Sequence, residues 1–225
     1  FYCFYMGMFE RIVPIFFLFL TYFLYLCIEI KKNIKKMVTS IDVNYGLFLK
    51  KLNQIGINTD LLDEKYGEKI KNGTFTNTNE YGMAYEGSLL EIVLRTLTHY
   101  AVRLNELFPE EYRIDKDKLI KVCLLHHIAK SIRLTKNDNA WEVEKRGLTY
   151  KYSENNPSIR NGLQSMMMAI ECGISFDTDE VEAMTSIDRD LSDMQSRFHS
   201  SLFSIIIRQA NELTYAEFKT KKNEE

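Results

Sequence analysis

The chain has 225 residues, enough for one domain with a sizeable core, and its 45% hydrophobic and 27% charged residues are typical of a globular protein. Its formal net charge of −2 gives no basic surface of the kind that nucleic-acid binding needs, so we expect no nucleic-acid partner. The four cysteines form no C-x-x-C motif, which argues against a disulfide framework or a structural zinc site and favours free thiols in a reducing compartment.

The first 36 residues differ in composition from the rest of the chain. Residues 12–28 form an uncharged apolar run, which is at the short end for a membrane-spanning helix, and several lysines follow it between residues 31 and 36. Lysines after the apolar run would keep the C-terminal side of such a helix in the cytoplasm, so one interpretation is a membrane anchor. The other is that translation starts at Met37 and the segment is an upstream translation artefact. Both interpretations place residues 37–225 in the cytoplasm, with a membrane contact only if the segment is genuine.

Two helical segments and a polar loop come next. Apolar residues recur at helical spacing from Leu47 to Ile55, where Gly56 ends the helix, and a second helix is expected over residues 60–71. Residues 72–87 (NGTFTNTNEYGMAYEG) are rich in turn-forming residues, and we expect this loop to be too polar and too long to pack against a core. We assign residues 37–85 to this helical lead-in and loop.

The pattern then predicts two long helices. Apolar residues every three to four positions predict one amphipathic helix over residues 88–108, which Pro109 ends. Residues 115–134 predict the next helix, which is apolar on most sides and is therefore expected to be a central, buried helix.

Shorter helices complete the chain. They are expected over residues 140–147, over residues 157–173, where Gly173 ends the helix, and from residue 177. Asp177 and Glu180 have the spacing of a capping box at the start of that last segment. The final helix is expected over residues 198–218. With no alternating strand pattern, residues 86–218 predict an all-α domain, followed by a charged tail at 219–225.

Three stretches of this sequence resemble the HD-domain phosphohydrolase superfamily. LLHHIAK at residues 124–130 is similar to the signature LLHDIGK, whose adjacent His and Asp bind a catalytic divalent metal. EGSLLE at 86–91 resembles the start of the preceding helix, and RQANEL at 208–213 resembles the closing helix. The resemblance covers residues 86–215 and implies an HD-like helical bundle. Within the superfamily, the sequence is most similar in character to HD-type proteins from gut bacteria and their phages.

The chain departs from that family at most of the metal-ligand positions that the resemblance implies. The family's first histidine falls on Ile92, the aspartate of the HD pair on His127 and the last aspartate on Asn211, while His126 is retained. Isoleucine cannot coordinate a metal, and a neutral histidine lacks the charge and the bridging oxygen that hard divalent cations prefer. We therefore expect no cofactor and a degraded metallophosphohydrolase centre.

A rewired metal site is the alternative. On a helix His126 and His127 would point about 100° apart, and His99 lies seven residues after Ile92 on the same helix face. A divalent transition metal held by these three histidines, with carboxylates from the acidic segment 188–193, would make the protein an active phosphohydrolase acting on nucleotides or other phosphoesters. Whether the protein is an enzyme stays open at this point.

Basic residues suggest the ligand. Lys130 ends the signature, where the lysine of the family often meets substrate phosphate, and Arg208 falls where the closing helix often carries a histidine. Lys145 and Arg146 end the short helix after residue 140. Guanidinium and ammonium groups around a pocket suit a phosphate-bearing ligand without a metal. We predict a divergent HD-like domain that binds a nucleotide or other phosphorylated ligand, or a protein partner, without hydrolysis. A purely structural module with a filled pocket is the third interpretation.

Overall fold

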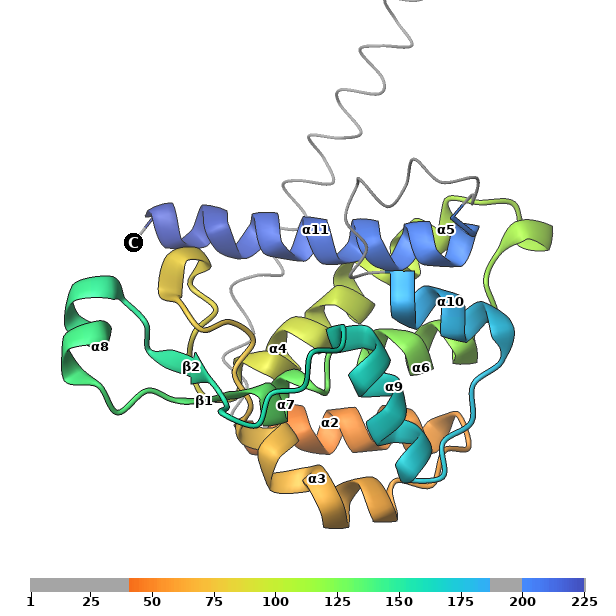
Figure 1. Ribbon diagram of the computed structural model, residues 1–225. Coiled ribbons are helices and arrows are strands. Elements are labelled where there is room, and N and C mark those ends of the chain that lie inside the picture. The colour runs from red at the N-terminus through yellow and green to blue at the C-terminus, as the bar shows by residue number, and fades with distance from the viewer. Residues whose placement is uncertain (1–40, 187–199, 225) are drawn as a thin grey trace, which may run out of the picture. The chain divides into compact units, whose positions relative to one another are not determined.

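The computed structural model describes residues 41–186 and 200–224, and these residues are mostly helical, as expected (Figure 1). The α-helices are α2 (Ile41–Gln54), α3 (Asp60–Asn72), α4 (Ser88–Arg95), α5 (Val102–Glu106), α6 (Lys116–Leu125), α7 (Lys130–Arg133), α8 (Ala140–Arg146), α9 (Asn161–Glu171), α10 (Thr178–Ser186) and α11 (Leu202–Glu224). None of the described helices is both long and apolar enough to cross a membrane, and the apolar run at 12–28 lies outside the described residues.

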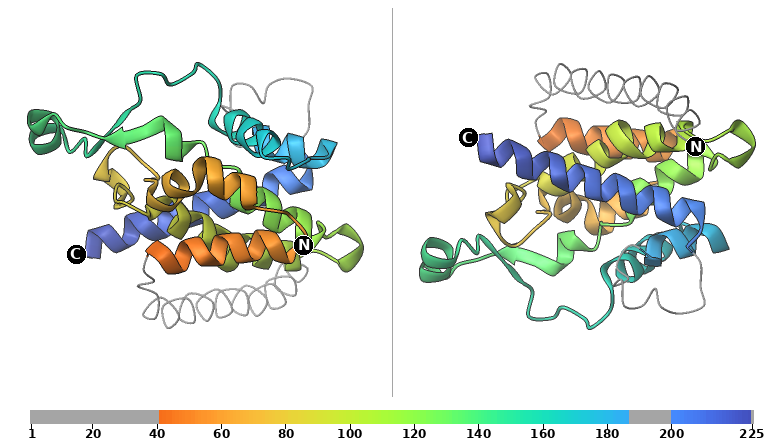
Figure 2. Two further views of the ribbon diagram at one scale, coloured as in Figure 1. Left: turned by 90° about the horizontal axis from the view of Figure 1, so that it is seen from below. Right: turned by 90° about the horizontal axis from the view of Figure 1, so that it is seen from above.

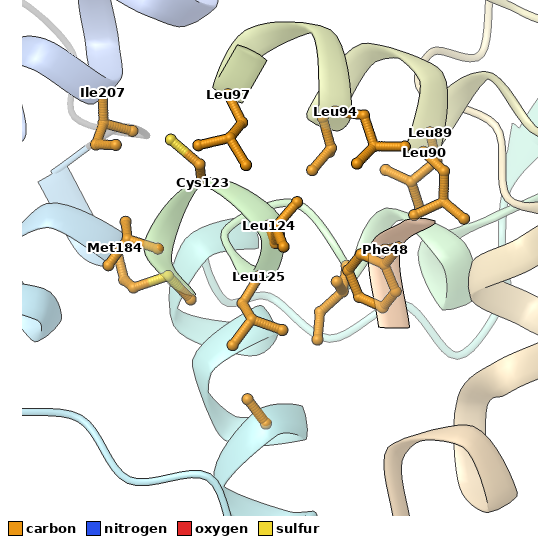
Figure 3. Packing of buried hydrophobic residues seen from close by; sticks show 14 of the residues in the cluster. Phe48, Leu89, Leu90, Leu94, Leu97, Cys123, Leu124, Leu125, Met184 and Ile207 are labelled. Atoms are coloured by element: carbon orange, nitrogen blue, oxygen red, sulfur yellow. The ribbon is translucent and has the colours of Figure 1, made fainter. Parts of the chain in front are cut away.

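Helix α6 is the centre of the hydrophobic core, as its all-round apolar pattern predicted. Leu119 and residues 122–125 of this helix are at most 1% exposed. Figure 3 shows the side chains around it, which come from elements far apart in the chain: Phe48, Leu89, Leu90, Leu94, Leu97, Met184 and Ile207. Each fully buried leucine contributes roughly 1.5–3 kcal/mol to folding. Helices from both ends of the described chain are therefore fixed around α6.

The predicted helix over residues 88–108 is present but is not a regular α-helix. A π-helical stretch, Thr96–Ala101, lies between α4 and α5. The hydroxyl groups of Thr96 and Thr98 donate to the carbonyl oxygens four residues earlier, at 2.9 and 2.8 Å. A π turn takes up an extra residue, so positions before and after it no longer share a face as they would in an α-helix. Ile92 is fully buried, whereas His99 is partly exposed.

The helix predicted over residues 115–134 ends early, at Leu125. Residues 126–129 form a turn, and the short helix α7 leads directly into strand β1 (Leu134–Lys136). This strand pairs antiparallel with β2 (Tyr150–Tyr152), with Thr135 opposite Lys151. The sequence pattern predicted no strands, so this small sheet is a correction. Both views of Figure 2 show the strands and α8, which lies between them in the sequence, as an arm that extends to one side of the helices.

The prediction that loop 72–87 stays outside the core is wrong. Phe75 and Met83 are each 2% exposed and belong to the hydrophobic core. The hydroxyl group of Ser88, at the start of α4, holds both ends of this segment: it accepts from the backbone N–H of Phe75 at 2.9 Å and donates to the carbonyl oxygen of Met83 at 2.8 Å. Gly87 closes the loop with a φ of 82°, and a Cβ atom there would lie 2.6 Å from Cγ1 of Ile41.

The predicted capping box at the start of α10 is confirmed. The backbone N–H of Glu180 donates to the Asp177 carboxylate at 3.0 Å, and the backbone N–H of Asp177 donates to the Glu180 carboxylate at 2.9 Å. This exchange satisfies two N–H groups that the first turn of a helix leaves without partners. The helix predicted from residue 198 is α11, which begins at Leu202.

Buried polar contacts join α11 to α4 and to the π-helical stretch that follows it. The hydroxyl groups of Thr214 and Thr96 lie 3.0 Å apart, and Glu217 forms an ion pair with Arg95 at 2.6 Å. The side chains of Arg95 and Glu217 are 7% and 8% exposed, and the Tyr100 hydroxyl group donates to the same carboxylate at 3.1 Å. Because an unpaired charge is costly to bury, these contacts favour one position of α11 along its axis.

Candidate functional site

The paired histidines lie in the turn after α6, not on a helix as predicted. Nδ1 of His126 lies 3.0 Å from the carbonyl oxygen of Val122 and 2.9 Å from that of Cys123. Two acceptors require a proton on Nδ1, and burial favours the neutral ring, in which the other nitrogen, Nε2, carries a lone pair. Nε2 lies 3.0 Å from the amide nitrogen Nδ2 of Asn211 on α11 and 3.2 Å from its carbonyl oxygen Oδ1. Because a lone pair on Nε2 needs a donor, the amide nitrogen is its hydrogen-bond partner. We therefore assign a neutral, fully buried His126 that accepts a hydrogen bond from Asn211.

His127 is the neutral tautomer with its proton on the opposite nitrogen. The Asn161 amide nitrogen lies 3.2 Å from the carbonyl oxygen of His126, which marks it as a donor, and 3.1 Å from Nδ1 of His127. Nδ1 of His127 is therefore the acceptor, and its Nε2–H donates to the hydroxyl oxygen of Tyr215 at 3.1 Å. Burial lowers the pKa of His127 well below its usual value, and the positive charge of the neighbouring Lys130 lowers it further.

The two imidazole rings lie side by side against one face of α11. Their centroids are 3.9 Å apart, and they contact Asn211 and Tyr215, which are one helical turn apart. The ring of Phe75, from the buried loop, meets His127 edge-on, with the ring centroids 4.9 Å apart. The pair thus joins α11, α9 and the loop at residues 72–87.

The ring nitrogens that could bind a metal ion here are both engaged in hydrogen bonds. The lone pair of His126 accepts from Asn211 and that of His127 accepts from Asn161, while Ile92 offers no ligand atom. Across residues 41–186 and 200–224, no group of three or more His, Cys, Asp or Glu residues is placed to hold a metal. The acidic residues Asp188, Asp190 and Asp193 of the predicted rewired site lie outside the described residues.

A cavity of about 380 Å³ opens beside His127. Most of the residues that line it are polar. They include the cations Lys130, Arg133 and Arg208, the amides Asn77, Asn161 and Asn211, the aromatic residues Phe75, Tyr152 and Tyr215, and the carboxylate Glu212. Three cationic side chains against one carboxylate give this set a net charge of +2, since His127 is neutral. The cavity is large enough for a small organic ligand and attracts anions.

Neighbouring groups hold two of these cations in the cavity wall. The ammonium group of Lys130 donates to the carbonyl oxygen of Phe75 at 3.0 Å and lies 3.7 Å from the centre of the Phe75 ring. The Arg133 guanidinium donates to the carbonyl oxygen of Ile159 at 3.0 Å. Arg208 lies on α11 one turn before Asn211 and Glu212. Cations positioned in advance lose less conformational entropy when a ligand binds.

No protein-family model, curated protein or solved structure matches this chain. The resemblance to HD-domain phosphohydrolases therefore stays a prediction from the sequence motifs. The geometry does bring together two positions that those motifs align with metal ligands of that family, because His126 of LLHHIAK contacts Asn211 of RQANEL. In this chain an amide hydrogen bond joins them.

The structure brings some of the predicted site residues to the cavity and leaves others elsewhere. Lys130 and Arg208 line it, together with His127 and Asn211. Lys145 and Arg146 are not among the described residues that line it. They are exposed on α8, where Arg146 pairs with Glu142 at 3.5 Å. His99 is also absent from the described lining, and its ring is 6.3 Å from that of Tyr100.

Sequence reasoning missed Arg133, Asn161 and Phe75. Arg133 follows Lys130 by three residues, and that spacing on a helix was a signal that both point the same way. Phe75 was an apolar residue in an otherwise polar segment, which is a sign of local burial. Asn161 gave no signal, because its partners are 34 and 35 residues away in sequence.

Proposed function

We propose that this protein binds a phosphorylated small molecule in the cavity beside His127, without a metal and without hydrolysing it. One observation carries the proposal: Lys130, Arg133 and Arg208, from α7 and α11, line the same cavity of about 380 Å³. One guanidinium group can donate two parallel hydrogen bonds to two oxygens of a phosphate group, and an ammonium group adds a compact positive charge. The amides of Asn77 and Asn161 in the same wall offer additional polar contacts.

The hydrogen bonds of the two histidines support binding rather than hydrolysis. A general base needs a free lone pair within reach of the attacking water. Nε2 of His126 accepts from Asn211, and Nδ1 of His127 accepts from Asn161. Burial also disfavours the protonated form of His127, so this side chain is a poor proton acceptor. A divergent HD-like domain that keeps the ligand cavity and has lost the reaction is consistent with these contacts.

Calorimetric titration of the full chain tests the proposal with inorganic phosphate, adenosine 5′-monophosphate and adenosine. We expect the two phosphate compounds to bind and adenosine to bind more weakly than its monophosphate. Arg208→Gln removes a charge-assisted contact, so phosphate affinity should fall about 10-fold or more. Lys145→Gln is the matched control, because it removes an exposed charge on α8 and should leave affinity unchanged.

Three results would overturn the proposal. They are the absence of binding by any phosphate compound, equal affinities of Arg208→Gln and the wild type, and an equal loss in Lys145→Gln. The same samples separate the proposal from the rewired phosphohydrolase. Phosphate release with Mn²⁺, together with a near-stoichiometric transition metal that is lost in His126→Ala, would replace our proposal with that alternative.

A further inference from the structure

A second cavity, of about 450 Å³, adjoins the first. The two share Phe75, Thr76, Lys130, Glu212 and Tyr215 in their linings, so they are adjacent. The second cavity adds residues that the first lacks: Tyr81, Met83, Ala216 and Lys219. We call the two cavities together the cleft along α11.

Helix α11 gives the spacing between the two parts of the cleft. It lines the first cavity with residues from Arg208 to Tyr215 and the second with residues from Glu212 to Lys219. The second set is displaced by four residues, which corresponds to about 6 Å along the helix axis. That distance is spanned by a few covalent bonds, as between a phosphate group and a ring esterified to it.

The two cavities differ in their chemistry. Arg133 and Arg208 line the first and not the second among the described residues. The second has Met83, which is 2% exposed, and the ring of Tyr81, with the ammonium group of Lys219 5.5 Å from the ring centroid. Flat, apolar groups pack well against such aromatic and thioether side chains.

We infer that the ligand is a phosphate monoester whose organic part is a compact aromatic ring, with the phosphate beside Arg208 and the ring beside Tyr81 and Met83. This inference rests on the proposed function and specifies its ligand. The Glu212 carboxylate lies between the two parts. The Lys130 ammonium group lines both parts as well, so the lining that they share has no net charge and does not repel the ester linkage.

Titration calorimetry with 1-naphthyl phosphate and inorganic phosphate tests the inference on the full chain. In the wild type, burying the ring should make 1-naphthyl phosphate bind about 10-fold more tightly than inorganic phosphate. Ala216 is exposed on α11, so Ala216→Phe fills the second cavity without disturbing the core. In this variant the affinity for 1-naphthyl phosphate should fall to that for inorganic phosphate, which itself should not change.

Leu213→Phe is the matched control, because Leu213 is an exposed α11 residue that is absent from the described linings of both cavities. It should leave both affinities at their wild-type values. If inorganic phosphate binds but the naphthyl group adds nothing, or if Ala216→Phe retains tight binding, the inference fails and the proposed function stands. If neither compound binds, both fail.

Discussion

The tautomer of His126 gives a prediction that the variant Asn211→Asp can test. In the native protein the amide of Asn211 donates to Nε2 of His126, at 3.0 Å. A carboxylate at this position can only accept, and so can Nε2 while Nδ1 donates to the carbonyl oxygens of Val122 and Cys123. Both residues are at most 2% exposed, so water cannot relieve the clash. We expect the folded variant to take up one proton, shared between His126 and Asp at position 211.

The size of the effect follows from proton linkage. Above a pH of about 6.5 the unfolded chain holds this proton on neither group, because an ordinary histidine and an ordinary aspartate are both deprotonated there. The folded variant binds one proton more than the unfolded chain, so its stability falls as the pH rises. The slope is about 1.4 kcal/mol per pH unit, or about 2.7 kcal/mol between pH 7 and pH 9. For a chain of 225 residues this lowers the midpoint temperature by roughly 5–10 °C.

Urea unfolding followed by circular dichroism at several pH values, in EDTA to exclude metal binding, measures this slope. The matched control is Gln209→Glu, the same change from amide to carboxylate at an exposed position of α11. It should differ from the wild type by no more than about 0.5 kcal/mol at every pH. If Asn211→Asp has the pH dependence of the wild type, His126 carries its proton on Nε2 and our assignment of the site is wrong.

Three further predictions concern other contacts. Because His127 stays neutral when folded, the free energy of unfolding of the wild type should decrease as the pH drops below about 6.5. In His127→Gln this decrease should be smaller by about 1.4 kcal/mol per pH unit between pH 5 and 6. Glu217→Gln leaves Arg95 buried with the more distant Glu91 at 3.4 Å, and urea unfolding should show a loss of about 3 kcal/mol. Asp177→Ala removes the cap of α10 and should cost roughly 0.5–2 kcal/mol in the same assay.

Each of these predictions has its own control or contrary result. An unchanged acid slope in His127→Gln would mean that His127 is protonated in the folded state. Glu171→Gln breaks an exposed ion pair with Lys65 and should cost less than about 1 kcal/mol. If Glu217→Gln loses as little stability as Glu171→Gln, the burial of the ion pair between Arg95 and Glu217 does not increase its contribution to stability. If Asp177→Ala unfolds at the same urea concentration as the wild type, the capping box adds no stability.

Local sequence signals predicted the helices well, because their causes lie within a few residues. The capping box of Asp177 and Glu180 is one example, and the buried apolar pattern of α6 is another. The early end of α6 could not be predicted in this way. No glycine or proline marks it, and the turn is stabilised by the side chain of His126, whose Nδ1–H donates to the last carbonyl oxygens of the helix.

Part of the lining of the candidate site could be predicted. Lys130 and Arg208 were found from the motifs, and the structure brings them to one cavity. The tautomers of the two histidines could not be predicted from the sequence. That of His127 depends on Asn161, 34 residues away, and that of His126 depends on Asn211, 85 residues away. The burial of Phe75 likewise depends on the tertiary contacts of a loop whose composition suggested exposure.

The buried polar contacts along α11 also restrict how the cleft can move. Asn211, Thr214, Tyr215 and Glu217 have partners in three other elements of the fold. A shear motion that slides α11 by one turn, about 5.4 Å, would break all of these contacts together. A movement that widened the cleft would therefore have to involve the other wall, the loop that carries Phe75 and Met83. A ligand that contacts Phe75 and Met83 would stabilise that loop, and amide hydrogen exchange there should slow when the cleft is filled.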